Sequence, residues 1–251
     1  RTIPSSRADQ RFLVLKQPVG VVGAITPWNY PISMITRKVA PAAAAGCTTV
    51  LKPAEATPLC ARAVFEIFEQ AGFPEGVVNL VTASAPGPVG QALLSDPRVR
   101  KLTFTGSTEV GKMLAREAST QLKRVSLELG GHAPFIVCTD ADPVHAAKGL
   151  SLVKFLNTGQ ACICPNRIYV HTDQLEPFLK ELTKRVASMR AGSGFEDGVR
   201  IGPLVNQAAL DKVDHQVRDA VDKGAELVCG GRRLHEEGLE QGFFYAPTIL
   251  T

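Results

Sequence analysis

The chain has 251 residues, of which 45% are hydrophobic and 21% charged, a composition that excludes disordered and collagen-like classes. Its formal charge is +4, and the basic residues are interspersed with acidic ones, so we expect no nucleic-acid partner. The most apolar run, residues 39–51, is much shorter than the roughly 20 residues that span a bilayer. We therefore expect no membrane-spanning segment.

Six cysteines are too few for a disulfide scaffold in a chain of this length. Because no signal peptide is recognisable, we expect a reducing compartment, the cytoplasm or, in a eukaryote, the mitochondrial matrix. The sequence opens on Arg1 without a methionine and stops at Thr251 without a polar tail. From these ends we expect a fragment of a longer protein.

Strand-like and helix-like segments alternate along the first half of the chain. Residues 11–25 predict a strand, a turn and a second, buried strand. Helices are then predicted at 31–46, 58–71, 87–94 and 109–118, and strands at 47–51, 77–81, 101–105 and 124–129. This alternation predicts an α/β fold, with a parallel sheet and helices on its faces.

The double glycine at 130–131 is the expected domain boundary, because glycine pairs interrupt regular structure. Beyond it the pattern predicts strands at 134–138, 167–171 and 225–229, helices at 143–156, 173–189 and 207–223, and a Gly- and Pro-containing loop at 191–203. The second half is therefore predicted to form another α/β unit.

Residues 105–111, TGSTEVG, follow a predicted strand and open a predicted helix. Backbone N–H groups and the helix dipole can bind a phosphate at such a place. The alternative is a helix that is only capped, with Ser107 or Thr108 as the N-cap. Either reading puts a polar turn at the end of a strand.

In residues 157–164, NTGQACIC, Cys162 follows a glycine-containing turn, where a thiol could be exposed enough to act as a nucleophile. An inert, buried cysteine is the alternative. The Cys162-x-Cys164 pair lacks further Cys or His ligands nearby, so we expect no metal site.

Two polar residues could assist such a nucleophile. Glu128 lies in an apolar strand just before the double glycine, so we expect a partly desolvated carboxylate suited to act as a base. A solvent-facing strand residue is the alternative, and His132 is another possible base. Asn29, between two prolines, could donate to an oxyanion or could simply form an Asx turn.

Five motifs occur in order: PWN at 27–29, LKPAEATP at 51–58, FTGSTEVGK at 104–112, LELGG at 127–131 and NTGQAC at 157–162. Together they resemble the NAD(P)-dependent aldehyde dehydrogenase superfamily, over the whole chain. The resemblance implies a Rossmann-like cofactor domain and an α/β catalytic domain, both incomplete here because family chains are longer. It assigns residues 1–18 to an oligomerisation hairpin, 19–130 to the NAD-binding domain and 131–251 to the catalytic domain, in a homodimer or homotetramer.

The resemblance also implies the chemistry. Cys162 attacks the aldehyde, Asn29 and the Cys162 N–H bind the oxyanion, and Glu128 activates the water that hydrolyses the thioester left after hydride transfer. It implies NAD as cofactor, with NADP possible, because Glu55 should repel a 2′-phosphate. The implied cofactor contacts are Ile25, Trp28, Lys52, Glu55, Gly106, Ser107, Gly111 and Leu129.

The subgroup that the chain resembles is succinate-semialdehyde dehydrogenase, through residues 13–31, MITRK at 34–38 and the CxC pair. Arg37 matches a residue that binds the substrate carboxylate in that subgroup. Leu156 stands where the subgroup commonly has a second such Arg, so glutarate semialdehyde, ketoglutarate semialdehyde or a less polar aldehyde are alternatives. The subgroup further suggests that Cys164 could form a reversible disulfide with Cys162.

Two other functions compete with this interpretation. The first is a truncated, non-catalytic nucleotide-binding fragment, which the presence of Cys162, Glu128 and Asn29 argues against. The second is a family member that transfers the acyl group to coenzyme A, and here Glu128 favours hydrolysis.

Overall fold

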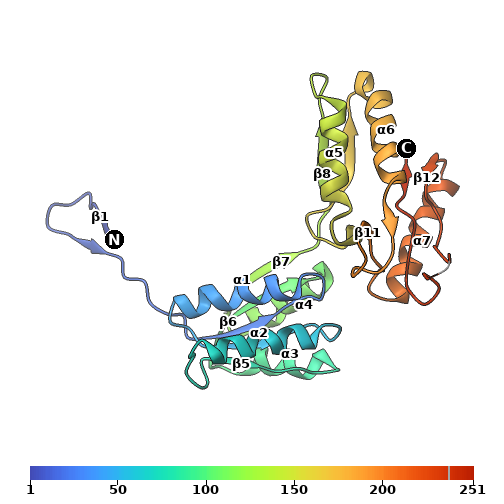
Figure 1. The fold of residues 1–251 in the computed structure, drawn as a ribbon. Helices are drawn as coiled ribbons and strands as arrows, with labels where there is room; N and C mark the ends of the chain where they lie inside the picture. The colour runs from blue at the N-terminus through green and yellow to red at the C-terminus, as the bar shows by residue number, and fades with distance from the viewer. Residues whose placement is uncertain (237) are drawn as a thin grey trace. The chain divides into compact units, whose positions relative to one another are not determined.

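The computed structural model describes residues 1–236 and 238–251, which form two compact units, 1–130 and 131–251 (Figure 1). Strands and helices alternate in both units, as predicted for an α/β fold. The roles of the units as cofactor and catalytic domains stay predictions. Within the described part of the chain, no helix is long and apolar enough to cross a membrane.

The first unit contains seven strands and four helices among its residues. The strands are β1 (Thr2–Ile3), β2 (Phe12–Leu13), β3 (Val21–Ile25), β4 (Thr49–Lys52), β5 (Val78–Leu80), β6 (Val99–Gly106) and β7 (Arg124–Leu129), and the helices are α1 (Pro31–Ala44), α2 (Pro58–Gln70), α3 (Pro86–Ser95) and α4 (Thr108–Ser119). Proline opens each of the first three helices, where its missing N–H costs no hydrogen bond. The Ser107 side chain caps α4.

Five strands of this unit form one parallel sheet in the order β5-β4-β3-β6-β7. The first strand of this sheet along the chain is the central one, β3. The chain then forms β4 and β5 on one side of β3 and returns to its other side as β6. Such a reversal is a topological switch point, and ligands of open α/β sheets bind in the crevice at the carboxyl ends of the strands there. The topology therefore directs attention to the loops after β3 and β6.

Helices cover both faces of this sheet. On one face, Ile35 and Val39 of α1 and Ala61 and Val64 of α2 pack against Leu51 of β4. On the other face, side chains of α3 and α4 form a second cluster with β6. Burial on both faces explains why the central strand β3, with the sequence VVGAI, is a continuous apolar run rather than an alternating one.

The second unit contains three two-stranded sheets among its described residues. Its elements are β8 (Ala133–Val137), α5 (Pro143–Lys154), the 3-10 helix η1 (Leu156–Gly159), β9 (Pro165–Val170), α6 (Thr172–Ala187), β10 (Arg190–Ala191), β11 (Val199–Ile201), α7 (Gln207–Asp222), β12 (Leu227–Cys229) and β13 (Ile249–Leu250). Helices α5 and α6 pack against β8 and β9 around Val137, Leu150 and Phe178. An apolar cavity of about 780 Å³ lies in this unit, lined by Phe155, Ile168, Phe178, Leu204, Val217 and Ile249, among others.

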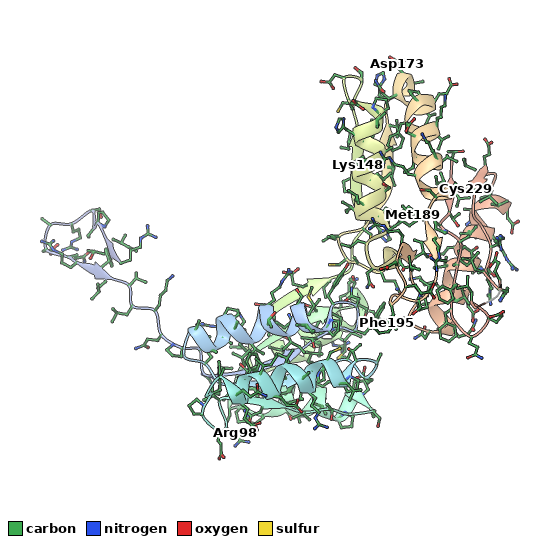
Figure 2. All side chains as sticks on the ribbon, in the orientation of Figure 1. Arg98, Lys148, Asp173, Met189, Phe195 and Cys229 are labelled. Atoms are coloured by element: carbon green, nitrogen blue, oxygen red, sulfur yellow. The ribbon has the colours of Figure 1, made fainter. Side chains whose placement is uncertain are left out.

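Two predicted boundaries in this unit are wrong. The loop expected at 191–203 contains the parallel pair β10–β11, and the helix expected to reach residue 156 ends at Lys154 before η1. Strands of two or three residues in a Gly-rich segment have no periodicity from which to predict them. Phe195, labelled in Figure 2, is an exposed side chain in the loop that joins β10 to β11.

Gly230 offers a test of packing in the second unit. Its φ is +81°, and a Cβ there would overlap Pro247 O and approach the Thr248 Cα to 2.8 Å, both backbone atoms. We expect Gly230→Ala to lower the free energy of unfolding by about 3 kcal/mol, because the cost of a left-handed alanine and the cost of the steric clash add together. Urea unfolding of the purified chain measures this loss.

The matched control is Gly224→Ala, where φ is +99° but no atom lies within 4 Å of the added Cβ. This control should lower the free energy of unfolding by only about 1 kcal/mol, the cost of a left-handed alanine without a clash. Equal losses for both variants would show that the backbone around Pro247 gives way.

Candidate functional site

The residues predicted to contact a cofactor come together at one edge of the first unit. Ile25, Lys52, Gly106 and Leu129 are the last residues of β3, β4, β6 and β7. Because these strands are parallel, their carboxyl ends share one edge of the sheet. Trp28 and Glu55 lie in the loops after β3 and β4, and Ser107 and Gly111 lie at the start of α4.

Close packing holds α4 against this edge. A Cβ on Gly111 would overlap the Leu129 side chain, so the helix approaches β7 more closely than a larger residue would permit. The Ser107 Oγ accepts a hydrogen bond from the Val110 N–H at 3.3 Å, which identifies Ser107 rather than Thr108 as the N-cap. Ser107 therefore caps the helix, whose N-terminus faces the same edge as the strand ends, and phosphate binding at this place stays a prediction.

Lys52 and Glu55 form an ion pair at this edge. Lys52 is almost fully buried, and its ammonium contacts the Glu55 carboxylate and donates to Pro53 O at 2.7 Å. Burial acts to raise the pKa of Glu55, but the hydrogen bond and the charge of Lys52 act against it, and the pKa lies below its ordinary value. Glu55 is thus an ionised carboxylate whose charge Lys52 partly balances.

Two buried hydroxyls in the described part of the chain have no hydrogen-bond partner at this edge. Thr26 directly follows β3, and Thr105 is the penultimate residue of β6. Both are less than 10% exposed, and an unsatisfied buried hydroxyl is costly. Both hydroxyl oxygens are enclosed by protein atoms, so the groups at this edge that a ligand would meet are the strand-end residues and the loops after them.

Glu128 is exposed, contrary to the prediction of a partly desolvated carboxylate. The reason is its place on β7, the edge strand of the sheet, which has a neighbouring strand on one side only. The solvent-facing alternative is therefore right for this residue. An exposed carboxylate can still accept a proton from a water molecule.

Lys38 is a residue that sequence reasoning missed. Its ammonium is buried and donates to the Thr103 Oγ1 at 3.0 Å. Burial lowers the pKa of Lys38 to about 8, and the nearby charge of Glu128 opposes this. The signal in the sequence is its spacing, because Lys38 lies four residues after Met34 on the buried face of α1.

The other two candidates of the first unit lie in the loop before α1 and in the middle of that helix. Asn29 is half-buried in the loop before the helix, and its Oδ1 accepts a hydrogen bond from the Tyr30 N–H at 3.1 Å. In an amide side chain only the nitrogen donates, so Nδ2 is the atom that would bind an oxyanion. Arg37 is exposed on α1, one residue before Lys38.

The two cysteines of the CxC pair have different surroundings. Cys162 is exposed in the loop between η1 and β9, whereas Cys164 is buried and its thiol approaches Lys154 O at 3.4 Å and Val153 O at 3.6 Å. All six cysteines are free thiols. The description of an inert, buried cysteine therefore fits Cys164 and not Cys162.

His132 has structural contacts in the second unit. Its Nδ1 lies 3.0 Å from the Asn166 Nδ2, and its backbone oxygen accepts two hydrogen bonds from Arg167. These contacts join the segment before β8 to the first residues of β9. Nothing in them favours His132 as the base over Glu128.

Comparisons of the sequence and of the structure with known proteins agree with one another. The family model described as "Aldehyde dehydrogenase family" matches residues 1–251. A probable succinate-semialdehyde dehydrogenase [NADP(+)] of Sinorhizobium fredii is 53% identical over 250 residues, which are 100% of this chain and 50% of the relative. A glutarate-semialdehyde dehydrogenase of Pseudomonas aeruginosa is 52% identical, over 99% of this chain and 50% of its own length.

Solved structures match the fold as well. A crystal structure described as an Escherichia coli NADP-dependent enzyme superposes with a TM-score of 0.95 at 50% identity, covering 100% of this chain and 51% of its own. The chain thus spans about half the length of the relatives it matches. With the family model matched from end to end, the chain belongs to the aldehyde dehydrogenase family.

Proposed function

We propose that the chain is part of an NAD(P)-dependent semialdehyde dehydrogenase in which Cys162 is the nucleophile. The observation that carries the proposal is the exposure of the Cys162 thiol in a loop whose neighbouring cysteine is buried and hydrogen-bonded. Asn29, Glu128 and the strand-end residues of the first unit supply the other functional groups. The predicted division into a hairpin, a cofactor domain and a catalytic domain belongs to this proposal.

The reaction begins when the Cys162 Sγ attacks the aldehyde carbon, a C–S bond forms, and the carbonyl electron pair moves onto oxygen. The Asn29 Nδ2 and the Cys162 backbone N–H donate to this oxyanion and so lower the barrier. A bound nicotinamide dinucleotide supplies the hydride acceptor. With the hydride accepted by such a cofactor, Cys162 would hold the acyl group as a thioester.

Hydrolysis completes the cycle. Glu128 accepts a proton from a water molecule, whose oxygen attacks the thioester carbon. The C–S bond then breaks, the Cys162 thiolate leaves, and the carboxylic acid product is released. A thiolate suits both steps, because it is a good nucleophile and a good leaving group.

For the substrate we propose succinate semialdehyde, with Arg37 as the partner of its carboxylate. Glutarate semialdehyde is a second candidate, because the partly exposed, apolar Leu156 stands where the subgroup commonly has a second cation, and because a similar relative is named for this substrate. The relatives named above include enzymes for both substrates. Ketoglutarate semialdehyde and less polar aldehydes are further candidate substrates, to be tested beside the first two.

The test is NADH and NADPH formation by the complete protein that contains this chain, with each of these aldehydes. The highest kcat/KM with succinate semialdehyde supports the first proposal, and the highest with glutarate semialdehyde supports the second. No turnover by a folded, complete protein would reject dehydrogenase function and favour a nucleotide-binding role.

Cofactor choice gives a prediction of its own. The name of the Sinorhizobium relative specifies NADP(+), whereas Glu55 favours NAD through repulsion of a 2′-phosphate. Because Lys52 balances part of the Glu55 charge, we expect NAD to be preferred only modestly. Glu55→Gln should raise the ratio of kcat/KM for NADP to that for NAD by about tenfold, equal to about 1.4 kcal/mol.

Steady-state kinetics with both cofactors measures this ratio. Glu66→Gln is the matched control, since Glu66 also pairs with a cation, Arg62, but lies on the exposed surface of α2. It should leave the ratio unchanged. An unchanged ratio in Glu55→Gln would remove Glu55 from the cofactor site.

Three further proposals concern the complete protein. Assembly as a homodimer or homotetramer would cover the exposed Ile3, Phe12 and Leu13 of the antiparallel pair β1–β2.

A reducing compartment, the cytoplasm or the mitochondrial matrix, would keep Cys162 reduced. Reversible disulfide formation with Cys162 would require Cys164 to leave its buried position, so it should be slow.

A further inference from the structure

The turn before the nucleophile has an unusual backbone. Asn157, Thr158 and Gly159 have φ values of 50°, 59° and 79°, three left-handed residues in succession. Asparagine and glycine tolerate this region, but a β-branched residue such as threonine rarely adopts it. The surroundings must therefore hold Thr158 in a conformation that it would otherwise leave.

A set of hydrogen bonds supplies that hold. The Thr158 Oγ1 accepts from the Gly202 N–H at 2.9 Å and lies 3.3 Å from Gly202 O, to which it can donate. The Gln160 Oε1 accepts from the Val205 N–H at 2.9 Å, and its Nε2 donates to Pro203 O at 3.3 Å. We call these contacts between Thr158, Gln160 and residues 202–205 the loop clamp.

The clamp is anchored in the core of the second unit. Residues 202–205 directly follow β11, whose last residue, Ile201, is buried. Leu204 is buried too, donates its N–H to Phe243 O at 2.9 Å, and packs with Leu210 and Tyr245. The clamp therefore ties the cysteine loop to a part of the fold that has little freedom to move.

The other end of the loop is fixed as well. The Cys164 N–H donates to Ala161 O at 3.1 Å, and the buried Cys164 thiol lies against the end of α5. Between these two attachments, Cys162 and Ile163 form an exposed apex. The direction of the Cys162 backbone N–H depends on the backbone torsions of this short stretch alone.

We propose that Thr158 and Gln160 are positioning residues, which through the loop clamp aim the Cys162 N–H and thiol at the aldehyde. This inference rests on the proposed function. A side chain can adjust by rotation, but a backbone oxyanion donor cannot, so a small movement of the loop should weaken oxyanion binding and slow hydride transfer. Neither residue needs to touch the substrate.

The test uses the complete protein and the pair Thr158→Val and Thr158→Ser. Valine keeps the size and the β-branch but removes both hydrogen bonds, whereas serine keeps the hydroxyl. We expect the rate of the first turnover, measured by stopped-flow NAD(P)H absorbance, to fall about 10- to 100-fold in Thr158→Val. Thr158→Ser should remain within about threefold of the parent, and the KM for the cofactor should change little in either.

Gln160→Met tests the same clamp independently, should Thr158→Val fail to fold. The matched control is Gln174→Met, because Gln174 also donates to a backbone oxygen, Thr139 O at 2.6 Å, but lies at the start of α6. We expect a slow first turnover in Gln160→Met and a normal one in Gln174→Met. Melting temperatures, measured alongside, separate lost stability from lost positioning.

An active parent with undiminished first turnover in both Thr158→Val and Gln160→Met overturns the inference and leaves the proposed function intact. An equal loss in Thr158→Ser also overturns it, because the hydroxyl would then be irrelevant. A folded parent that forms no NAD(P)H with any aldehyde overturns the proposed function, and this inference with it.

Discussion

Cys162→Ala should lower NAD(P)H formation by the complete protein by about 10⁴-fold or more, since no other group would form the covalent bond to the aldehyde. The thiol is exposed at the apex of its loop, so the substitution should leave the fold intact. Steady-state rates, with circular dichroism as a check on folding, measure the effect.

Cys164→Ala is the matched control for this prediction. Cys164 is buried, so its replacement should cost about 1 to 2 kcal/mol of stability through lost packing, and it should lower the rate far less than Cys162→Ala, because the nucleophile is still present. Should Cys162→Ala retain turnover while Cys164→Ala loses it, the assignment of the nucleophile would be reversed.

Glu128→Gln should separate the two halves of the reaction. The first turnover should still release one NAD(P)H per active site, because hydride transfer needs no base at this position. Subsequent turnovers should slow by about 10²- to 10⁴-fold, since the thioester must then be hydrolysed without general-base help. Rapid-mixing absorbance resolves the initial burst from the slow steady state, and mass spectrometry of the quenched protein should show the acyl adduct.

Lys38 provides an internal check on where Glu128 lies. The carboxylate opposes the effect of burial on Lys38, so removing its charge should lower the pKa of Lys38 below about 8. NMR titration of lysines labelled with ¹³C at Cε follows this directly. A Lys38 pKa that is unaffected would place the Glu128 side chain away from α1.

The periodic elements of the first unit were predictable because each is long and regular. Strand β7 was expected at 124–129 and is found at Arg124–Leu129, and α2 was expected at 58–71 and is found at Pro58–Gln70. Proline at the start of a helix and an apolar run in a strand are local signals. The order of the strands in the sheet, by contrast, is set by contacts that no local pattern encodes.

The residues that differ from expectation do so through tertiary packing. Glu128 lies in an apolar strand, but an edge position leaves it in solvent. Lys38 carries a charge, but the geometry of α1 buries it against Thr103. Thr158 gives no local sign of a left-handed turn, because partners that lie 44 residues further along the chain hold it there.

The cavity of the second unit has a practical consequence for handling the protein. Wide apolar openings take up hydrophobic dyes and encourage self-association at micromolar concentrations. The 251-residue polypeptide, expressed by itself, should therefore show strong fluorescence with anilinonaphthalene sulfonate and a narrow range of solubility. Polypeptide that packs onto Phe155, Ile168 and Val217 would suppress both, which makes dye fluorescence a simple assay for binding at this cavity.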